Sequence, residues 1–338
     1  MMRISAILLI SAAALIAAAA ATAPTDGRSE KLWRDWKAAH NRNYRTRAAE
    51  DAKRAIFFEN ARIVDEWNSQ VKVAEDDAKL ALNDFADMSN EEYSNMLTFV
   101  VPERSREVPD LFQARRASRS ARAAPVVLPT SLDYRQSGFV GPVGDQARCG
   151  SCWAFSAAGA CSGAHAKAGH PFVDLSPQQL VDCSAGRYNF GCSGGDTVAG
   201  ASYAVLSGLM SEAEYPYTAV AGQCLYRNTS IAHFTGIVEL PAGNERVLAE
   251  ALYQYGTLSV AVNASPESFQ LYHEGVLRDR TCSPRALNHA MVLVGYTANS
   301  WILKNSWGIG WGQAGFIRIA RNSGNMCGVA SYSLAVIA

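Results

Sequence analysis

The sequence predicts an α+β domain with two halves, preceded by a separate helical unit at the N-terminus. All eight cysteines lie between Cys149 and Cys327, and residues 1–148 have none. More than half of the charged residues fall within residues 1–124 in a helix-like pattern, whereas the rest of the chain is rich in Gly, Tyr and Cys. After residue 125 the helix signals come first and the strand signals second, an order typical of α+β domains.

Composition places the chain among globular proteins. Of its 338 residues, 49% are hydrophobic and 18% are charged, which supplies enough apolar material for a core. The formal net charge is zero, so there is no overall electrostatic attraction to nucleic acid or to an acidic membrane surface. We therefore expect no nucleic acid among the partners, and no stable membrane association once the signal peptide described next is removed.

The first residues predict a secretory signal peptide over residues 1–23. A short positive start ending at Arg3 precedes an apolar run from Ile4 to Ile16, and small residues such as Ala21 and Ala23 follow as a cleavage site. The alternative is a transmembrane anchor, because the run with its alanines approaches the length of a membrane span. The alanine-rich composition and the small residues at the end favour the signal peptide.

A secretory route predicts a secreted or lysosomal/endosomal protein in which disulfides are permissible. It also makes N-glycosylation feasible. Two tripeptides fit the acceptor pattern, Asn228-Thr229-Ser230 and Asn263-Ala264-Ser265.

Residues 31–70 predict two amphipathic helices joined near residues 41–44. Apolar side chains recur at helical spacing, and charged residues fill the other positions. These apolar residues are Leu32, Trp33, Trp36, Ile56, Phe57, Ile63, Val64 and Trp67. Residues 80–85 alternate apolar and polar side chains as a strand would, and Ser89 caps a further short helix with an acidic first turn.

Residues 101–125 predict a solvated, extended linker. They hold three prolines and six arginines, and no hydrophobic period survives there. Such a segment is an easy target for proteases. A permanent tether between two domains would show the same pattern, so these residues alone leave processing open.

The C-terminal part predicts helices followed by strands. Residues 152–167 form a run of small side chains suited to a buried helix, and Ser176-Pro177 begins another helix. Strand signals cover residues 258–262, 290–296, 301–304 and 315–319.

The stretch Cys149-Gly150-Ser151-Cys152 permits three interpretations. Half of a zinc site would need a second ligand pair at similar spacing, but the other cysteines are scattered singly. A thioredoxin-like redox pair belongs in a reducing compartment, which the signal peptide argues against. The remaining interpretation is a disulfide cysteine beside a reactive one, and it requires neither a metal nor a cofactor.

Cys152 is the candidate nucleophile because it lies where a loop meets a helix start. Unpaired N–H groups and the positive end of the helix dipole stabilise a thiolate there. A nucleophilic cysteine also needs a histidine for proton transfer and a third group to orient that histidine. Of the six histidines, only His289 combines strand-like apolar neighbours with a nearby downstream amide, Asn305, in a Trp- and Gly-rich frame.

Four motifs extend this pattern over nearly all of residues 128–338. They are Cys149-Gly-Ser-Cys152-Trp-Ala-Phe, Gly191-Cys192-Ser193-Gly194-Gly195, Leu287-Asn288-His289-Ala290 and Asn305-Ser306-Trp307-Gly308. In these motifs, and in a Cys-to-His and Cys-to-Asn spacing of about 130–150 residues, the chain resembles the papain family of cysteine peptidases and its cathepsin L-like branch. The resemblance implies a papain-like two-lobed α+β domain, with a helical half and a β-barrel-like half, behind an N-terminal helical propeptide.

The resemblance also implies a role for each residue near the nucleophile. Cys152 would attack as a thiolate paired with protonated His289, which then serves as acid and base. Asn305 would orient the histidine, and Trp307 would shield their hydrogen bond from water. The Gln146 side chain and the Cys152 backbone N–H would form the oxyanion hole.

By the same resemblance, Gly194 and Gly195 would offer open backbone to a substrate strand, in a cleft shared with Asn288 and Trp307. The residue two before the cut would enter a pocket lined by Asp196, Thr197, Ala261, Leu287 and Tyr332. Tyr332 would shorten this pocket, which favours Leu or Val over Phe or Trp. Asp196 is expected to be a solvated residue at the rim, too weakly paired to outweigh the apolar wall.

The resemblance implies the disulfides Cys149–Cys192, Cys183–Cys224 and Cys282–Cys327, although six cysteines alone would allow 15 arrangements. Cys161 is then left over, as a buried inert thiol or, as a lesser alternative, a regulatory one.

The N-terminal region resembles the inhibitory propeptide of the same branch. Its first motif falls on Lys53, Phe57, Asn60, Val64 and Asn68, with Ala49 where the family has Glu. Its second motif falls on Ala81, Asn83, Phe85 and Asp87. An inhibitory propeptide and linker over residues 24–124 would be removed near residues 124–128, leaving a catalytic domain over residues 125–338. Acid would promote release by protonating carboxylates such as Asp87.

The sequence thus predicts a cysteine endopeptidase made as an inactive precursor. It would cleave proteins and peptides through a thioester acyl-enzyme, work as a monomer and be inhibited by its own propeptide. One alternative is an exopeptidase of the same fold, which would need an added loop or retained peptide at one end of the cleft. The other is a non-catalytic binding or inhibitory homologue, which would be expected to lose Cys152, His289 or Asn305, whereas all three are present.

Overall fold

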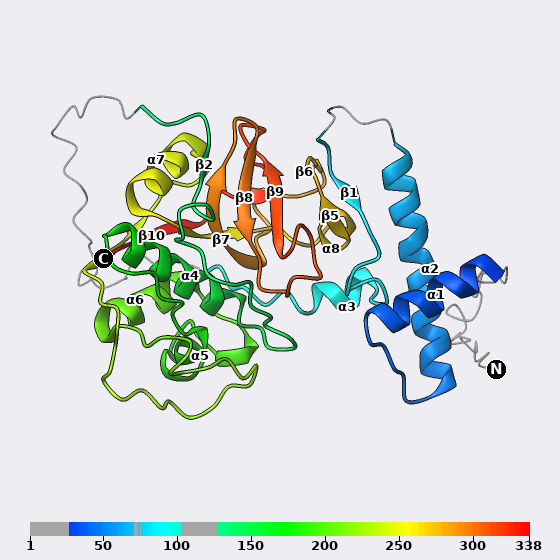
Figure 1. The fold of residues 1–338 in the computed structure, drawn as a ribbon, viewed down its shortest axis with the longest axis horizontal. Coiled ribbons are helices and arrows are strands. Elements are labelled where there is room, and N and C mark those ends of the chain that lie inside the picture. The colour runs from blue at the N-terminus through cyan, green and yellow to red at the C-terminus, as the bar shows by residue number, and fades with distance from the viewer. Residues whose placement is uncertain (1–26, 71–73, 75, 103–126) are drawn as a thin grey trace, which may run out of the picture.

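The computed structural model describes residues 27–70, 74, 76–102 and 127–338. The signal peptide predicted for residues 1–23, and most of the predicted linker, lie outside the described residues. Figure 1 shows three parts in contact: an N-terminal segment (the described residues from 27 to 102), a helical lobe and a sheet-rich lobe. The α+β prediction is confirmed.

The helical lobe surrounds one central buried helix. Its elements are α4 (Cys152–Lys167), α5 (Pro177–Cys183), a 3-10 turn (Gly191–Ser193) and α6 (Thr197–Ser207). Helix α4 packs against α5 and α6 on the helical side and against strands β4 and β7 of the sheet, whose bounds follow. It is therefore the element that joins the two lobes.

The small side chains of α4 are explained by this packing. A Cβ added at Gly159 would lie 2.5 Å from the side chain of Val292, and one at Gly163 would clash with Thr257. Protein interiors are close-packed, so larger residues at these points would push the helix off the sheet.

The sheet-rich lobe holds one large, mixed sheet. Its strands follow the order β3-β10-β4-β7-β8-β9-β6, and β2 pairs with β7. Strands β6 and β9 are parallel, and the other pairs are antiparallel. The strands are β2 (Leu132–Asp133), β3 (Gly236–Glu239), β4 (Leu258–Val262), β6 (Val276–Leu277), β7 (His289–Tyr296), β8 (Ser300–Lys304), β9 (Phe316–Ala320) and β10 (Ser333–Ile337). Around them lie α7 (Glu245–Tyr255), α8 (Glu267–Gln270), β5 (Tyr272–Glu274) and a 3-10 turn (Met326–Gly328).

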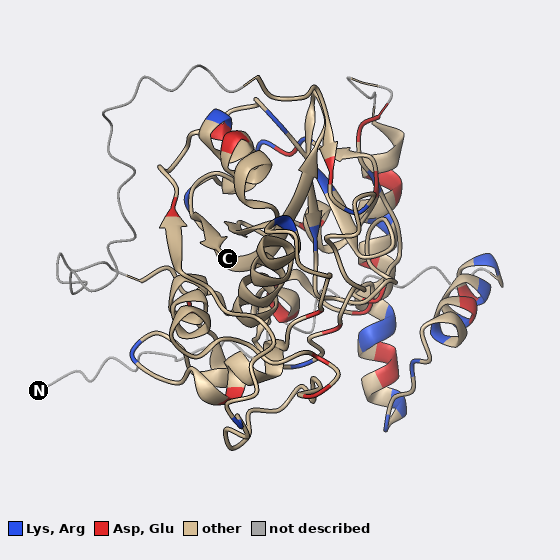
Figure 2. Cartoon of the chain, turned by 60° about the vertical axis from the view of Figure 1, so that its left-hand side comes forward, with Lys and Arg blue, Asp and Glu red and all other residues tan. Residues whose placement is uncertain are grey.

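The N-terminal segment contains the helices that the sequence predicts. They are α1 (Gly27–Ala39), α2 (Arg47–Ser69) and α3 (Asn90–Ser94), with a two-residue strand β1 (Lys79–Leu80). Lys, Arg, Asp and Glu alternate along α1 and α2, whereas most of the C-terminal domain carries few charges (Figure 2). The two helices bury a small apolar core in which Trp33, Trp36 and Phe57 pack with Val64.

Two details of this segment differ from the sequence prediction. The strand predicted for residues 80–85 is limited to β1, which pairs with β5 of the C-terminal domain. Beyond it, Asn83 turns the chain by accepting the N–H of Phe85 and donates to the Gln270 carbonyl at 2.9 Å. Leu32 is 43% exposed, because the buried face of α1 is centred on the two tryptophans.

Three disulfides join Cys149 to Cys192, Cys183 to Cys224 and Cys282 to Cys327. These are the pairs that the resemblance implies. Cys152 and Cys161 are free thiols, and both are buried. Burial raises the pKa of Cys161 far above its usual range, as expected for an inert core thiol.

Candidate active site

Cys152 is the first residue of α4, at the junction of loop and helix that the sequence predicts. The residue before it, Ser151, is fully buried, and its hydroxyl lies 2.5 Å from the hydroxyl of Tyr217. Tyr217 also donates to the carbonyl of Gln146 at 3.1 Å. It thereby ties the loop before the nucleophile to the helix start, a role that no motif in the sequence indicates.

His289 begins β7, and Asn305 follows directly after β8. Because β7 and β8 are antiparallel neighbours, these two ends come together. The His289 Nε2 atom lies 2.8 Å from the Asn305 Oδ1 atom, and both side chains are buried. The indole of Trp307 stacks on the imidazole, with ring centroids 4.5 Å apart, and covers this hydrogen bond.

The thiol of Cys152 lies beside the start of β7. Burial raises the pKa of this thiol, and the backbone N–H groups of Ala290, Trp153 and Cys152 itself, which lie near the sulfur, offset part of that rise. The contact to Ala290, the residue after His289, brings the candidate nucleophile and the candidate base into one site. The structure thus brings together the residues that the sequence singled out from three distant stretches.

Burial opposes the charged forms of both groups. It raises the pKa of Cys152 to about 11, in spite of the nearby backbone N–H groups. Burial also lowers the pKa of His289 to about 4, in spite of its bond to Asn305. Burial therefore disfavours the charged form of each of these two groups taken by itself.

Gln146 lies under the same loop. Its side-chain N–H donates to the Cys149 carbonyl at 2.9 Å, and its side-chain oxygen accepts from the Ser306 hydroxyl at 2.7 Å. The backbone N–H of Gln146 also donates to the Ser306 carbonyl at 2.8 Å. Ser306 was not singled out from the sequence, although it lies inside the Asn305 motif.

An extended stretch of the N-terminal segment occupies the cleft beside these residues. The N–H of Phe99 donates to the Asn288 carbonyl at 3.2 Å, and the N–H of Val100 donates to the Gly195 carbonyl at 3.2 Å. Phe99 and Gly195 form a parallel bridge. Gly194 has φ +113°, and a Cβ there would collide with the carbonyl of Thr98, so glycine is required where the two backbones meet.

The side chain of Phe99 enters the predicted specificity pocket. It belongs to the same buried cluster as Ala261, against which Leu287 and Tyr332 also pack. Its ring meets the ring of Tyr332 edge-on, with centroids 5.6 Å apart. The pocket therefore admits a phenylalanine ring, which the preference predicted from the sequence did not anticipate. Thr197 is buried as the first residue of α6.

The prediction that Asp196 is a solvated rim residue is wrong. Asp196 is 3% exposed and is the N-cap of α6, where its carboxylate accepts the N–H groups of Val198 and Ala199 at 3.2 Å. The hydroxyl of Tyr332 donates to the same carboxylate at 2.5 Å. The helix start and the pocket tyrosine together draw the side chain inward.

The structure also argues against Asn263 as a glycan acceptor. Asn263 is 4% exposed, and its side-chain oxygen accepts the N–H of Ser265 at 3.0 Å. A glycan there would have to leave the interior. Asn228, in contrast, lies on an exposed loop.

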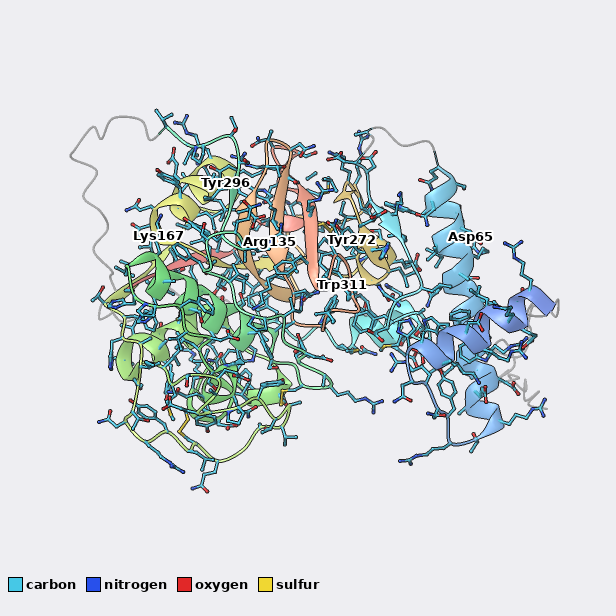
Figure 3. All side chains as sticks on the ribbon, in the orientation of Figure 1. Asp65, Arg135, Lys167, Tyr272, Tyr296 and Trp311 are labelled. Carbon is cyan, nitrogen blue, oxygen red and sulfur yellow. A yellow bond between two sulfur atoms is a disulfide. The ribbon has the colours of Figure 1, made fainter. Side chains whose placement is uncertain are left out.

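A cluster of aromatic rings connects the N-terminal segment to the site. Phe85 and Tyr93 of that segment both meet the ring of Trp307 edge-on, at centroid distances of 5.1 and 5.7 Å. Phe269 and Trp311 surround the same indole from the C-terminal domain. Figure 3 shows Tyr272 and Trp311 on the side of the sheet-rich lobe nearest the N-terminal segment.

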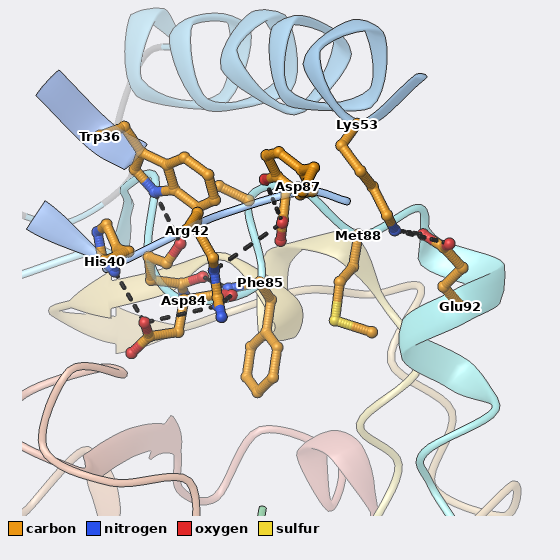
Figure 4. A network of polar contacts seen from close by, with 12 residues as sticks. Trp36, His40, Arg42, Lys53, Asp84, Phe85, Asp87, Met88 and Glu92 are labelled. Carbon is orange, nitrogen blue, oxygen red and sulfur yellow. Dashed lines mark hydrogen bonds and ion pairs between the residues drawn. The ribbon is translucent and has the colours of Figure 1, made fainter. Parts of the chain in front are cut away.

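Polar contacts hold the N-terminal segment in shape around this cluster (Figure 4). Asp84 contacts His40 at 2.8 Å, and Lys53 pairs with Glu92 at 2.7 Å. Asp87 accepts from the Tyr44 hydroxyl at 2.7 Å. Asp87 therefore stabilises the segment itself, whereas the carboxylates that form ion pairs across the interface, described below, are others.

The motif positions of α2 serve the same purpose. Asn60 donates to the carbonyls of Ala86 and Met88 at 2.8 and 2.9 Å, and Asn68 exchanges two hydrogen bonds with Leu80. Lys53, another position of this motif, pairs with Glu92 of α3. Within the described ranges, no cluster of three or more His, Cys, Asp or Glu side chains could hold a metal ion.

Comparison with known proteins identifies both parts of the chain. Residues 128–337 match the family described as "Papain family cysteine protease". Residues 33–93 match the "Cathepsin propeptide inhibitor domain (I29)".

Individual relatives agree with these matches. The cathepsin L-like proteinase of Fasciola hepatica is 39% identical over 311 residues, which cover 90% of this chain and 92% of that protein. Cathepsin K of Mus musculus is 37% identical over 305 residues, which cover 88% and 90%. The structure of digestive procathepsin L 3 from the larval midgut of Tenebrio molitor matches with a TM-score of 0.81 and 34% identity, covering 93% of this chain and all of that one. The chain therefore belongs to the papain family of cysteine proteases, as a cathepsin L-like endopeptidase made as a zymogen.

Proposed function

We propose that Cys152 is the nucleophile and His289 the general acid and base of this endopeptidase. Asn305 positions His289, and Gln146 donates to the oxyanion. The observation that carries these assignments is the 2.8 Å contact between His289 Nε2 and Asn305 Oδ1. It holds the ring through one nitrogen and leaves Nδ1 for proton exchange with the thiol, which lies beside the N–H of Ala290.

Hydrolysis would proceed in two stages. The Cys152 sulfur, as thiolate, bonds to the carbonyl carbon, and His289 gives its proton to the leaving amine as the C–N bond breaks. Water then gives a proton to His289 while its oxygen bonds to the acyl carbon and the thioester breaks, which restores the thiolate–imidazolium pair. The backbone N–H of Cys152 and the second side-chain N–H of Gln146, which is not used by Cys149, would stabilise the oxyanion.

The path of the chain through the cleft supports cleavage within a polypeptide. Residues 98–102 pass Gly195 and Asn288 and continue past Tyr332. Hollows of about 290 and 510 Å³ are lined by Val101 together with that tyrosine. A substrate chain can therefore continue beyond the specificity pocket in this direction. The exopeptidase alternative would require this end, or the other, to be closed.

We infer that residues 24–124 form the inhibitory propeptide and linker, that residues 125–338 form the mature enzyme, and that residues 1–23 direct secretion. The blocked cleft supports inhibition by this segment. Removing the segment would readmit water and favour the charged forms of Cys152 and His289. Three disulfides support a secreted or lysosomal/endosomal location. Because one chain supplies the whole site, we further propose a monomer.

Acid should release the segment through carboxylates at its interface. Arg278 pairs with Asp76 at 3.3 Å and with Asp77, and Lys79 pairs with Glu274 at 2.8 Å. The hydrogen bond and charge of Lys79, with smaller help from His273 and Arg318, lower the pKa of Glu274. A carboxyl whose pKa falls on docking favours docking above its free pKa, and this contribution is lost as pH falls through the docked pKa.

We therefore expect Arg278→Gln to shift activation of the full-length precursor to higher pH, because docking is already weakened at neutral pH. The shift should be small, a fraction of a pH unit, since partly exposed ion pairs contribute little. The midpoint pH of processing, followed by gel electrophoresis, measures it. Arg246→Gln, which removes an exposed pair within α7, is the matched control. An unchanged midpoint in Arg278→Gln would remove this pair from the mechanism.

Glycosylation should occur at Asn228 alone. Expressed in a eukaryotic secretory host, the protein should carry one glycan, seen as a single mass change on enzymatic deglycosylation. Asn228→Gln should abolish this change, and Asn263→Gln should retain it because the Asn263 side chain is buried. A glycan that survives in Asn228→Gln would contradict the assignment.

A further inference from the structure

Glu212 carries a carboxyl group that the mechanism proposed above does not use. Its backbone N–H donates to the Asp174 carbonyl at 2.8 Å, beside an antiparallel bridge between Leu175 and Ser211. Its Oε1 atom accepts the backbone N–H of Tyr217 at 2.9 Å. Its Oε2 atom is buried and has no hydrogen-bond partner among the residues that the structure describes. Burying a polar atom without a partner costs stability, so the position of this acid calls for a reason.

Tyr217 connects this carboxyl to both proposed oxyanion donors. Its hydroxyl donates to the carbonyl of Gln146 at 3.1 Å and lies 2.5 Å from the hydroxyl of Ser151, the residue directly before Cys152. Burial raises the pKa of Tyr217 to about 12, so the phenol keeps the proton that it donates. The ring also meets that of Phe155 on α4 edge-on, with centroids 4.7 Å apart. One phenol therefore holds the loop of Gln146 against the start of α4.

We propose that Glu212 is a positioning residue for catalysis, which acts through Tyr217 to keep Gln146 and the start of α4 in register. The oxyanion is stabilised only when its donors lie at hydrogen-bond distance from the place where the charge develops. A small shift of the Tyr217 backbone would move both donors at once, because one hydroxyl contacts both segments. This inference rests on the proposed function, since it requires the Gln146 side chain and the Cys152 N–H to be the donors.

The first test removes the acceptor. Burial raises the pKa of Glu212 to about 7, in spite of the Tyr217 N–H, so in an acidic assay the side chain is an uncharged acid and glutamine is its closest mimic. In trimmed enzyme, Glu212→Ala should lower kcat about tenfold and leave KM within about twofold, since the donors act on the transition state. Glu212→Gln should recover kcat to within about threefold of the unmodified enzyme, because its side-chain oxygen can still accept the Tyr217 N–H.

The second test asks whether Glu212 acts through the phenol. Tyr217→Phe removes the hydroxyl, keeps the ring and should lower kcat about as far as Glu212→Ala does. In the double variant the additional loss should be less than about twofold, because residues that act through one contact are not additive. An additional loss of about tenfold would mean independent effects and would overturn the proposal. An unchanged kcat in Tyr217→Phe would overturn it as well.

Glu214→Ala is the matched control in the same turn. The Glu214 carboxylate accepts the Ser211 hydroxyl at 2.9 Å on the exposed side, and its loss should leave kcat and KM unchanged. An unchanged kcat in Glu212→Ala would contradict the proposal, and so would a loss in Glu212→Gln as large as that in Glu212→Ala. Glu212→Leu fills the space without offering an acceptor, and it replaces the alanine variant if that variant does not fold.

The experiment separates this inference from the proposed function. Titration with a thiol-alkylating inhibitor counts working sites in every variant, so that a loss of folded protein is not counted as a loss of kcat. If the unmodified enzyme neither cleaves the peptide nor reacts with the inhibitor, the catalytic assignment fails. If it does both and Glu212→Ala turns over at the same rate, only the positioning role of Glu212 fails.

Discussion

Replacing Cys152 with alanine should abolish turnover of a peptide substrate, with a loss on the order of 10⁴-fold or more, as for other nucleophiles of acyl-transfer enzymes. His289→Ala should come close to the same loss, because no other group would move the proton. Asn305→Ala should lose less, since Asn305 positions His289 and transfers no proton itself. The measurement is a fluorogenic peptide assay after the linker has been cut by an added protease, because the inactive variants cannot process themselves.

Folding must be shown to be intact in these variants. The thermal unfolding midpoint of each precursor should match that of the unchanged chain. Cys161→Ala offers a control on the same helix, because this second free thiol is fully buried and should be dispensable for turnover. Undiminished turnover in His289→Ala would refute the assignment of the acid and base.

The intact precursor should be at least about a hundredfold less active than the trimmed enzyme, a difference that corresponds to about 3 kcal/mol of docking free energy. The physical reason is direct occupation of the cleft. Phe99 fills the specificity pocket, and the backbone of residues 98–100 uses Asn288 and Gly195. Activity is measured on both forms at the same pH, with electrophoresis to show that the linker of the precursor is uncut. Equal activities would contradict inhibition by the N-terminal segment.

Phe85→Ala provides a sharper form of this test. Removing a buried phenylalanine ring costs about 3–5 kcal/mol, and here the lost contacts are those with Trp307 and Tyr93. The intact variant should therefore be more active than the intact unmodified precursor. The trimmed enzyme made from it should have unchanged activity. Leu32→Ala, on the exposed side of α1, is the control and should leave the activity of the intact precursor as low as before.

Much of the fold could be predicted from local patterns. The start of α5 at Pro177 after its Ser176 cap, and the capping box of α3, follow from short-range hydrogen bonding that the sequence states directly. The strand expected at residues 80–85 does not form in full, because alternating apolar and polar residues do not by themselves supply a neighbouring strand to pair with. Only the two residues of β1 pair with β5. After them, Asn83 and Phe85 contact the C-terminal domain through their side chains.

The candidate site divides in the same way. Cys152, His289 and Asn305 stand in motifs whose chemistry is readable from residue type and spacing. Tyr217 and the burial of Asp196 were not predictable, because each depends on contacts between residues far apart in the chain. Asp196 looks like a loop acid in the sequence, and only the approach of Tyr332, 136 positions later along the chain, makes it part of a wall. The burial of Cys152 and His289 was also not predictable from the sequence, since it depends on contacts between distant parts of the chain.

Trp307 serves two parts of the protein at once, as the cover over the bond between His289 and Asn305 and as the surface on which Phe85 and Tyr93 rest. The N-terminal segment and the catalytic domain belong to one chain, and residues of both contact the indole of Trp307. A heritable change of this residue would therefore be tested by selection in both roles at once. A lineage cannot loosen the hold of the inhibitor by altering Trp307 and keep the catalyst as it was. It must instead vary Phe85 or Tyr93, in the segment that we propose is removed.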